Sequence, residues 1–568
     1  MPSPSSAGSG GDRDGSAGNG GMGGPGSAGN GGMGGPGSGT AGDGGMGGPG
    51  ITLRPVGDHA LLVELPGLPE VLSLQAQLRE HPVDGQVDVV PAARTVLVTL
   101  EDARHVEALA NRLRTLDLSR SAGQDDTLIT IEVHYDGDDL TDVAARTGLS
   151  EDAVIAAHTA TPWVAAFGGF APGFAYLTGG DPRLGVPRRD SPRTVVPAGS
   201  VALAGEFSAV YPRRSPGGWQ LIGRTDAALW DIHRAQPALI SPGNRVLFTA
   251  VRELVEVRSR VLPAPVVPPD PSSPRADATP ARVGLTVVHP GLSSTLQDLG
   301  RPGLMALGVA GAGALDRAAL RQANRLVGNG AGSAVIESLN GGLVLEAEED
   351  QVLAVTGADV HLAISRPDGG EREPALCAPF LLRAGEVLRQ SLPVAGLRTY
   401  TAVRGGFEAD EVLGSRSTDS MSGLGPPALT PGTRVAVGRP AAGSVVGNPE
   451  EPRRAGMPEV LRVVPGPRDD WFDDGLARLC GTSWTVTAQS NRIGLRLDGP
   501  ALERTREGEL PSEGTVRGAL QIPPSGLPVL FLADHPVTGG YPVLAVVAAA
   551  DLDRAAQLAP GSVVRFRI

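Results

Sequence analysis

The chain of 568 residues contains no lysine, so all 49 of its basic side chains are arginine. A Walker A nucleotide loop needs its lysine, and a Schiff base or a covalently carried biotin is also built on a lysine amine. The sequence therefore excludes these devices, together with a serine–serine–lysine amidase site. Arginine can bind anions, but its pKa is too high for proton transfer near neutral pH.

Cysteine is almost as scarce, with Cys377 and Cys480 as the two examples and no CxxC pair. A zinc ribbon or a dithiol redox site needs closely spaced cysteines. We therefore expect two free thiols that are buried as small apolar side chains. The GxSxG and HExxH patterns are also missing, which argues against the usual serine-hydrolase elbow and the zincin motif.

Positive net charge and long apolar runs are lacking as well. The formal net charge is −13, whereas binding to nucleic acid or to an anionic membrane requires basic surface. No apolar run approaches the ~18 residues that a membrane span needs. The first residues, MPSPSSAGSGG, have neither a cationic start nor an apolar stretch, so no secretory signal is indicated. We expect no nucleic-acid partner, no membrane partner and a cytoplasmic location.

Glycine and proline are abundant, and they mark the expected boundaries. Residues 15–50 repeat an 11-residue glycine-rich unit, which cannot bury a core and predicts a disordered tail. Residues 263–282 hold seven prolines and predict a semi-rigid linker. The expected segments are the tail, a small α+β module, a β-rich domain, the linker and two further β-rich lobes: 1–50, 51–124, 125–262, 263–282, 283–445 and 446–568.

The spacing of apolar residues predicts individual elements. Residues 95–100 (TVLVTL) alternate as in a strand, and residues 102–116 place apolar side chains at helical spacing after Asp102 as a cap. Further predicted elements are strands at 127–133 and 563–568 and a helix that Asp316 caps and Gly328 ends. Short β-like runs cut by Pro and Gly over 161–258 favour a closed barrel or a sandwich.

Residues 138–160 have the pattern of a helix–turn–helix, with Ser150 capping the second helix. Either DNA recognition or simple packing of two helices would explain this pattern. Glu151 and Asp152 stand where a recognition helix would meet phosphates. The charge therefore favours two packed helices.

Aromatic residues make up 4% of the chain, yet five of them fall between Trp163 and Tyr176, around the segment FGGFAPGFAYL (167–177). Its glycines allow close backbone approach, and its proline stiffens the turn. The rings could wall a small site for an apolar and amide ligand, or they could fill a structural corner of a barrel. Both interpretations stay open here. Candidate binding residues in the segment are Phe170, Pro172, Gly173 and Phe174.

Several long motifs occur in an order that resembles one family. The matching segments are His158, GFAPGFAYL (169–177), PRRDSPRTVVPAGSVALAG (187–205), YPRRSPGGWQLIGRT (211–225), TLQDLGRPG (295–303), GALDRAALRQANRLVGN (313–329), LGSRST (413–418), QSNRIGLRL (489–497), REGELPSEG (506–514) and ADHPVTGGYPV (533–543). The first half resembles the B subunit of bacterial 5-oxoprolinase and the second half resembles its C subunit, also described as allophanate hydrolase subunits 1 and 2. The departures from the family pattern are Trp163, Arg404 and Val537.

The resemblance implies a mainly β fold with cyclophilin-like β-barrels and a small N-terminal α+β module. It also implies ATP-dependent opening of 5-oxo-L-proline to L-glutamate, with Mg²⁺, together with a separate A subunit. The expected partners are that subunit, a small-molecule substrate and, as one option, further copies of the chain. Two alternatives are a carboxyltransferase component of biotin-dependent urea or amide carboxylation and a module that inhibits or antagonises a histidine kinase.

The candidate site residues come from these motifs. His158 is either a packed, hydrogen-bonded histidine or a general base. Glu513 and Asp534 are the other catalytic candidates, with Glu509 as a further carboxylate near a glycine turn, and no metal ligands are assigned. Besides the loop residues named above, candidate contacts to substrate or nucleotide are Arg188, Arg193, Gly217, Gly218, Trp219, Arg224, Gln489, Ser490, Arg492, Thr538, Gly539, Gly540 and Tyr541.

Overall fold

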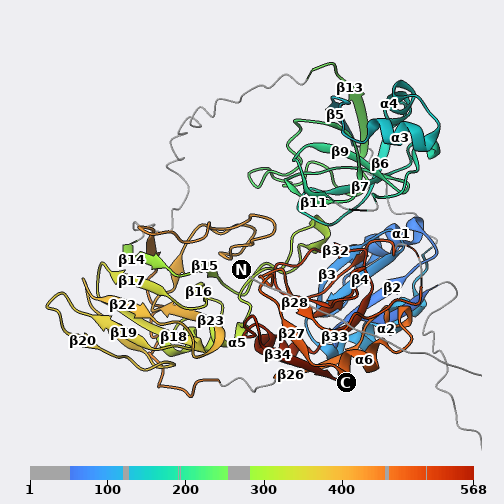
Figure 1. Ribbon diagram of the computed structural model, residues 1–568. Helices are drawn as coiled ribbons and strands as arrows, with labels where there is room; N and C mark the ends of the chain where they lie inside the picture. Colours follow the sequence, from blue (N-terminus) through green and yellow to red (C-terminus); the bar gives the residue numbers. More distant parts are fainter. Residues whose placement is uncertain are drawn as a thin grey trace, which may run out of the picture. The chain divides into compact units, whose positions relative to one another are not determined.

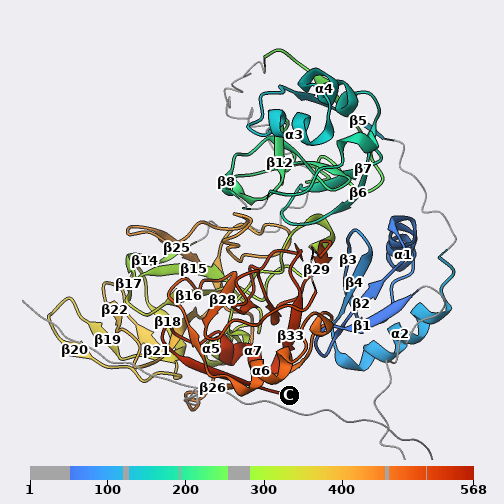
Figure 2. The ribbon, with the colours of Figure 1, turned by 45° about the vertical axis from the view of Figure 1, so that its right-hand side comes forward.

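An antiparallel four-stranded sheet with two helices on one face forms the first part of the structure (Figure 2). The elements are β1 (Thr52–Pro55), β2 (Ala60–Glu64), α1 (Leu68–Glu80), β3 (Gln86–Pro91), β4 (Thr95–Leu100), a 3₁₀ turn (Ala103–His105) and α2 (Val106–Thr115). Leu74, Leu78 and Leu109 pack with the strand residues Val96 and Val98 to form its core. The predicted strand at 95–100 and the helix after Asp102 are confirmed.

The computed structural model describes residues 51–118, 127–253 except 190 and 192, 282–453, and 459–568 except 507 and 509 (Figure 1). The expected tail at 1–50 and nearly all of the expected linker at 263–282 lie outside the described residues. Glu509 lies outside them too.

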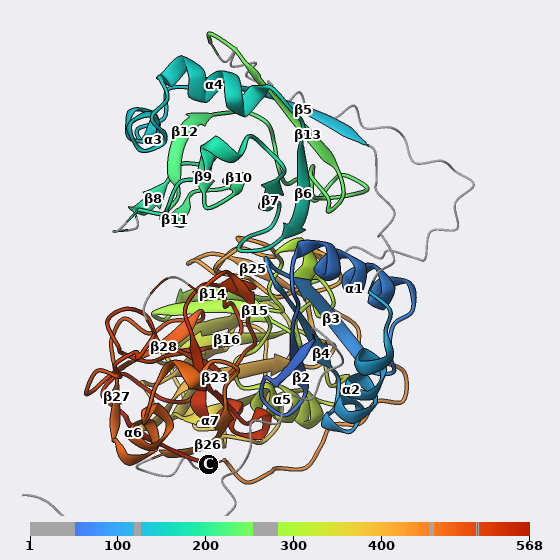
Figure 3. The ribbon, with the colours of Figure 1, turned by 90° about the vertical axis from the view of Figure 1, so that its right-hand side faces the viewer.

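The second part is a seven-stranded sheet that curves until it nearly closes (Figure 3). The elements are β5 (Leu128–Val133), α3 (Leu140–Thr147), α4 (Glu151–Thr159), β6 (Trp163–Gly168), β7 (Ala175–Thr178), a 3₁₀ turn (Pro182–Leu184), β8 (Arg193–Val196), β9 (Ser200–Ala204), β10 (Phe207–Val210), β11 (Ser215–Gly217), β12 (Gln220–Arg224) and β13 (Arg245–Ala250). The strand order is β12-β9-β10-β7-β6-β13-β5, and β8 pairs with β11. A bridge between His134, just after β5, and Arg224 of β12 joins the two edge strands.

Helices α3 and α4 pack against this sheet through an apolar face. Val143 and Val154 are fully buried in the same core as Ile131 and Phe248. Ser150 caps α4 by accepting a hydrogen bond from the Ala153 N–H at 3.2 Å. The two helices are therefore packed on the sheet, as the charges in their sequence favoured.

The third part packs a seven-stranded sheet (β20-β19-β22-β17-β14-β25-β24) on a five-stranded one (β15-β16-β23-β18-β21). The elements are β14 (Arg282–Pro290), β15 (Ser293–Gln297), a 3₁₀ turn (Met305–Leu307), α5 (Arg317–Val327), β16 (Val335–Leu339), β17 (Leu343–Ala347), β18 (Gln351–Asp359), β19 (Leu362–Ser365), β20 (Glu371–Arg372), β21 (Phe380–Leu382), β22 (Val387–Gln390), β23 (Ala395–Val403), β24 (Phe407–Glu408) and β25 (Arg434–Val437). As predicted, the Asp316 carboxylate accepts from the Ala319 N–H at 2.8 Å, and the left-handed Gly328 ends α5.

The last part is a closed seven-stranded barrel in the order β26-β33-β30-β31-β28-β27-β34. The elements are β26 (Glu459–Pro465), a 3₁₀ turn (Asp469–Trp471), α6 (Gly475–Gly481), β27 (Trp484–Val486), β28 (Gly494–Asp498), β29 (Glu513–Gly514), β30 (Ala519–Gln521), β31 (Val529–Phe531), β32 (Thr538–Gly539), β33 (Val543–Val547), a 3₁₀ turn (Ala549–Asp551), α7 (Leu552–Ala555) and β34 (Val563–Arg567). The predicted class, mainly β with barrels and a small α+β module, is confirmed. Both cysteines are free, but Cys480 is only half-buried.

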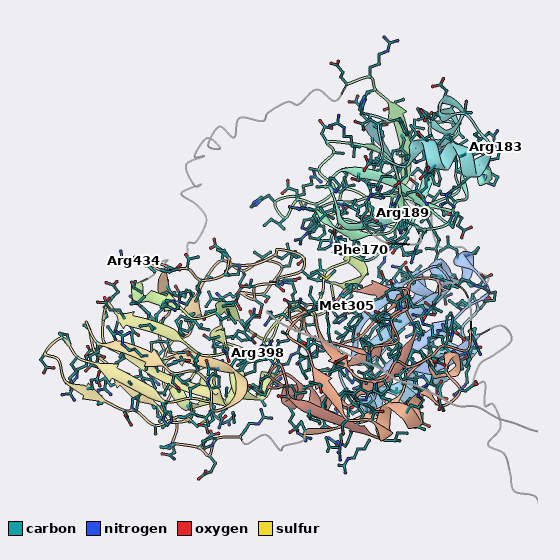
Figure 4. All side chains as sticks on the ribbon, viewed as in Figure 1. Phe170, Arg183, Arg189, Met305, Arg398 and Arg434 are labelled. Atoms are coloured by element: carbon teal, nitrogen blue, oxygen red, sulfur yellow. The ribbon has the colours of Figure 1, made fainter. Side chains whose placement is uncertain are left out.

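The glycine-rich segment between β6 and β7 contacts the second half of the chain at short range. A Cβ atom on Gly168 would lie 2.7 Å from the Ala306 carbonyl oxygen, and one on Gly308 would lie 2.3 Å from that of Ala171. The Phe170 N–H donates to the Thr538 Oγ1 at 3.0 Å, and Phe170 is labelled in Figure 4. These glycines therefore let two backbones approach each other where a side chain would keep them apart.

A buried carboxylate fixes the same stretch of the second half to the N-terminal module. Asp88 on β3 is buried, and it accepts hydrogen bonds from the N–H groups of Gly303 (3.1 Å) and Met305 (2.9 Å). Burial raises the pKa of Asp88, although the two backbone hydrogen bonds oppose the rise. The segment before and within the 305–307 turn is thus held by the module and lies against the glycine-rich segment.

Substitution of Gly168 by alanine tests this contact. Gly168 has no left-handed backbone, so the new methyl group acts through its clash with the Ala306 carbonyl. We expect the clash to weaken the contact by about 1–3 kcal/mol. Hydrogen exchange should become faster at residues 168–172 and 305–308. The control is Gly311→Ala, where a Cβ meets no atom within 4 Å, and equal exchange in the two variants would contradict the prediction.

Candidate functional site

One arginine joins carboxylates from opposite ends of the described chain. Arg468 donates from Nε to the Glu513 Oε2 at 3.0 Å, and its two Nη atoms make short ion pairs with Glu513 and Glu64. Glu64 ends β2 of the N-terminal module, whereas Glu513 begins β29 of the C-terminal part. Arg468 and Glu513 are each 7% exposed, so this ion pair is largely removed from water.

Burial and pairing act in opposite directions on the two carboxyl groups. Burial raises the pKa of Glu513, although the hydrogen bonds and charge of Arg468 oppose the rise. Burial also works to raise the pKa of Glu64, but hydrogen bonds and charge from Arg54 and Arg468 outweigh it, so the Glu64 pKa is lowered. The same carboxylates raise the pKa of Arg468 against the opposing effect of its burial. Arg468 is therefore a fixed positive charge near neutral pH.

A cavity of ≈ 430 Å³ adjoins this ion-pair network. It is lined by Thr52, Glu64, Leu65, Pro66, Arg94, Thr95, Arg468, Trp471, Arg506, Leu510, Pro511, Ser512 and Glu513. Its wall thus combines residues of the N-terminal module with residues of the C-terminal part. We call it the arginine cavity, because Arg94, Arg468 and Arg506 provide its positive charge.

A second cavity of ≈ 210 Å³ shares residues 510–512 with the first. It is lined by Ala93, Phe167, Tyr176, Pro187, Arg188, Ala204, Gly205, Phe207, Trp219, Leu510, Pro511 and Ser512. The Ser512 hydroxyl lies 3.4 Å from the Tyr176 hydroxyl and accepts from an Arg188 Nη at 3.3 Å. We call it the aromatic cavity, and Ser512 lies at the wall that it shares with the arginine cavity.

The rings of the aromatic cavity belong to one packed cluster. Tyr176 stacks on Phe167 at a centroid distance of 4.4 Å, and it meets Trp219 edge-on at 5.5 Å. Phe174 contacts Trp219 and Tyr211 behind this wall. The two interpretations of the aromatic segment are therefore not exclusive, since some rings pack the barrel while others also line a cavity.

Several of the predicted contact residues come together at this place. Arg188, Trp219 and Glu513 line the two cavities. A Cβ on Gly540 would lie 3.1 Å from an Arg188 Nη, so the absence of a side chain there leaves room for the guanidinium. Thr538 and Gly539 form β32, which pairs with β29 at Glu513. Phe170 joins this group through its hydrogen bond to Thr538.

The structure places His158 elsewhere, inside the core of the β5–β13 sheet. It is 0% exposed and stacks on Phe248 at 4.4 Å. Its two ring nitrogens lie 2.7 Å from the Tyr135 hydroxyl and 2.8 Å from the Ser208 hydroxyl. Burial lowers the pKa of His158 to about 3. This geometry favours the packed, hydrogen-bonded histidine over the general base.

Asp534 and Arg492 form a different buried network. Arg492 donates to both carboxylate oxygens of Asp534, at 3.0 and 2.9 Å, and also pairs with Glu337 of β16. Asp534 is 0% exposed and accepts further bonds from the N–H and hydroxyl of Ser420. Because Glu337 also accepts from Tyr400 at 2.9 Å, these groups join the C-terminal barrel to the five-stranded sheet. None of these residues lines either cavity.

The remaining predicted contacts are dispersed. Arg193 pairs with the buried Asp139 at 2.8 Å, and Arg224, whose side chain is 60% exposed, pairs with Asp136. Gln489 is exposed and the Ser490 hydroxyl accepts from the Arg496 N–H. The others lie in turns or strands next to the aromatic cluster or to β32: Pro172, Gly173, Phe174, Gly217, Gly218 and Tyr541.

Sequence reasoning missed Glu64, Arg94, Arg468 and Arg506 as site residues. Glu64 reads as an ordinary strand end, and Arg468 belongs to none of the segments that carry the resemblance. Ser512 lies within a matching segment, REGELPSEG, but no pattern in that segment marks it as a contact. Only the contact between distant segments reveals these residues.

The described residues do not provide a ready-made metal site. Among residues 51–118, 127–253, 282–453 and 459–568, with the gaps given above, no three His, Cys, Asp or Glu side chains come together as metal ligands. These described residues therefore do not form a protein ligand set for Mg²⁺. In the same described ranges no helix is long and apolar enough to cross a membrane.

Comparison with known proteins shows the class of protein to which the chain belongs. The family model "Carboxyltransferase domain, subdomain C and D" matches residues 51–240, and "Carboxyltransferase domain, subdomain A and B" matches residues 307–568. A crystal structure of a protein called TTHA0988 superposes with a TM-score of 0.76 at 33% identity, covering 90% of this chain and 99% of that one. The chain thus has the fold of a carboxyltransferase-domain protein that carries both subdomain pairs.

Curated relatives then define the family. The 5-oxoprolinase C subunit of Escherichia coli K12 is 36% identical over 293 residues, covering 50% of this chain and 90% of the relative. The 5-oxoprolinase B subunit of Escherichia coli O157:H7 is 37% identical over 208 residues, covering 35% of this chain and 95% of the relative. A urea amidolyase of Lachancea kluyveri is 31% identical over 49% of this chain but only 16% of its own length. The chain belongs to the family of the 5-oxoprolinase B and C subunits, joined in one polypeptide.

Removal of Arg468 tests the ion-pair network. Arg468→Ala leaves Glu513 buried without its cation, and loss of one partner of a buried pair costs about 3–5 kcal/mol. We expect a loss of that size in the free energy of unfolding by chemical denaturation. Arg506→Ala is the control, since Arg506 is 53% exposed and pairs with Asp470 at 3.0 Å, and it should lose no more than about 1 kcal/mol. Similar losses in both variants would refute a buried network.

The pH dependence of stability tests the assignment of His158. Its pKa is lowered to about 3 in the folded state and is about 6.5 in an unfolded chain. Below pH 6.5 the unfolded chain binds a proton that folded His158 does not, so the stability due to this group declines as pH falls. The unfolding free energies of the wild type and His158→Gln should therefore converge by about 2 kcal/mol between pH 7 and pH 5. A difference that stays constant over this range would show that His158 takes up a proton in the folded protein as readily as in the unfolded chain.

Proposed function

We propose that this chain supplies both the B and the C components of an ATP-dependent 5-oxoprolinase, which opens 5-oxo-L-proline to L-glutamate with a separate A subunit. The support is that relatives named as the B and C subunits of 5-oxoprolinase match it over most of their own lengths. Their names as subunits also indicate a larger assembly.

The lining of the two cavities supports this proposal independently of the relatives' names. The two adjoining cavities take their walls from both halves of the chain: Tyr176 and Arg188 come from the B-like half, and Ser512 and Arg468 come from the C-like half. Cavities built by both halves explain why the two components would work together. Fusion into one polypeptide keeps the two components that provide these walls in equal amounts.

The chemistry needs activation of the substrate. The carbonyl of a cyclic amide is a poor electrophile, since amide resonance stabilises it. Transfer of the terminal phosphoryl group of ATP to the lactam oxygen releases ADP and creates a leaving group. Water can then add to the carbonyl carbon of the lactam, and the ring C–N bond breaks as its nitrogen takes up a proton. A second water then releases phosphate and leaves L-glutamate.

Phosphoryl transfer depends mainly on alignment and charge neutralisation. Arg94 and Arg506 line the arginine cavity, and a guanidinium can hold phosphate oxygens through two parallel hydrogen bonds. Arg468 lines it too, but its guanidinium is occupied by the ion pairs with Glu64 and Glu513. A lysine-free chain can therefore bind polyphosphate at this place. The proposal assigns the phosphates of ATP to the arginine cavity.

A second candidate function is carboxyl transfer in biotin-dependent urea or amide metabolism. The two carboxyltransferase-domain models and the resemblance to a urea amidolyase favour it. The chain has no lysine, so the biotin would have to be carried by another protein.

Reconstitution separates the two candidates. The full chain mixed with a 5-oxoprolinase A subunit is expected to release ADP and L-glutamate in equal amounts, and only when 5-oxo-L-proline is present. Coupled assays for both products measure this. Arg94→Ala should raise the KM for ATP about tenfold or more, as expected for loss of a charged hydrogen bond. An assembled complex that shows no such turnover but accepts carboxyl groups from carboxybiotin would establish the second candidate instead.

A further inference from the structure

The arginine cavity has an apolar wall beside its arginines. Leu65 and Pro66 of the N-terminal module line it together with Leu510 and Pro511 of the C-terminal part. Trp471 is the single aromatic residue among its thirteen lining residues. The cavity holds ≈ 430 Å³, and pockets for small ligands and cofactors typically hold about 300–1,000 Å³. It therefore suits a ligand that carries an apolar group as well as phosphates.

Trp471 brings an unused hydrogen-bond donor to this wall. Although Trp471 is only 8% exposed, its indole N–H donates to no acceptor in the described part of the chain, and the nitrogen stays accessible. The indoles of Trp163 and Trp484, by contrast, donate to the carbonyl oxygens of His158 and Leu479, at 3.0 and 2.9 Å. Buried donors are nearly always satisfied in folded proteins. An unused donor on a mostly buried ring that lines a cavity thus points to a ligand in that cavity.

The backbone holds Trp471 next to one of the arginines. The Trp471 carbonyl accepts from the N–H of Thr505 at 2.9 Å and from its hydroxyl at 3.1 Å, and Arg506 follows Thr505 in the chain. Arg506 pairs with Asp470 at 3.0 Å, but its side chain is 53% exposed. Exposed pairs are weak, so a phosphate group can take the place of this carboxylate. The indole ring and a guanidinium for phosphate are therefore held close together.

Two carboxylates also line the cavity, but both are already paired. Glu64 and Glu513 form ion pairs with Arg468. With three arginines against two glutamates in its lining, the cavity keeps a net positive charge that favours an anion.

We propose that the arginine cavity binds the whole nucleotide, with the base at Trp471 and the phosphates at Arg94 and Arg506. This inference rests on the function proposed above and names the residue that recognises the base. The indole N–H donates to a ring nitrogen of adenine. Leu65 and Leu510, which line the same cavity, provide apolar contacts for the base and the ribose.

Binding of two ligands by the full chain tests this assignment without any turnover. ATP carries the base and the phosphates, whereas inorganic tripolyphosphate carries the phosphates alone. Trp471→Phe keeps a ring but removes the N–H donor, so the Kd for ATP should rise about two- to tenfold, and the Kd for tripolyphosphate should stay the same. Arg94→Ala should raise both constants. Isothermal titration calorimetry measures them.

Tryptophan fluorescence gives a second readout, which the wild-type chain provides by itself. ATP should change the emission, and tripolyphosphate should not. Trp471→Phe should abolish the change. Trp484→Phe is the matched control and should keep it, because Trp484 is fully buried, lines neither cavity and already donates to Leu479.

The possible outcomes separate this inference from the proposed function. Equal emission changes with ATP and tripolyphosphate, a Kd for ATP that Trp471→Phe leaves unchanged, or a chain that binds neither ligand would each overturn the inference. Turnover in the reconstituted complex would still support the proposed function in these cases. ATP bound at Trp471 in a complex that does not turn over 5-oxo-L-proline would count against the proposed function alone.

Discussion

The ion-pair network around Arg468 is the interaction on which the candidate site depends. A guanidinium with two carboxylates at its edges is stable away from water only when its partners stay in place. Glu64 and Glu513 come from segments more than four hundred residues apart, and both line the arginine cavity. The network therefore holds Glu513 in place, and Ser512, the residue before it, lines both cavities.

The aromatic and glycine-rich segment between β6 and β7 has two structural roles. Tyr176 is packed in the ring cluster of its barrel and also presents its hydroxyl to Ser512. Gly168 and Gly169 have no side chains at the positions where Ala306 and Thr538 approach. Rings and glycines occur together because one segment both completes a barrel and contacts the other half of the chain.

The sequence was sufficient for features that depend on local patterns. The strand at 95–100 and the Asp316 cap could be predicted, since alternation and capping act over a few residues. The fold class followed from the resemblance of long motifs to a known family. The partners of charged residues could not. Asp534 and Arg468 are equally plausible surface groups in sequence, and only the tertiary contacts place one in a structural network and the other beside a cavity. The domain boundaries remain predictions.

A crystal structure of the full chain with 5-oxo-L-proline tests the central claim most directly, namely that both halves together form one substrate site. The account predicts ligand density in the cavity that Tyr176 of one half and Ser512 of the other half line together. Density for the ligand within one half alone, away from Ser512, would contradict it.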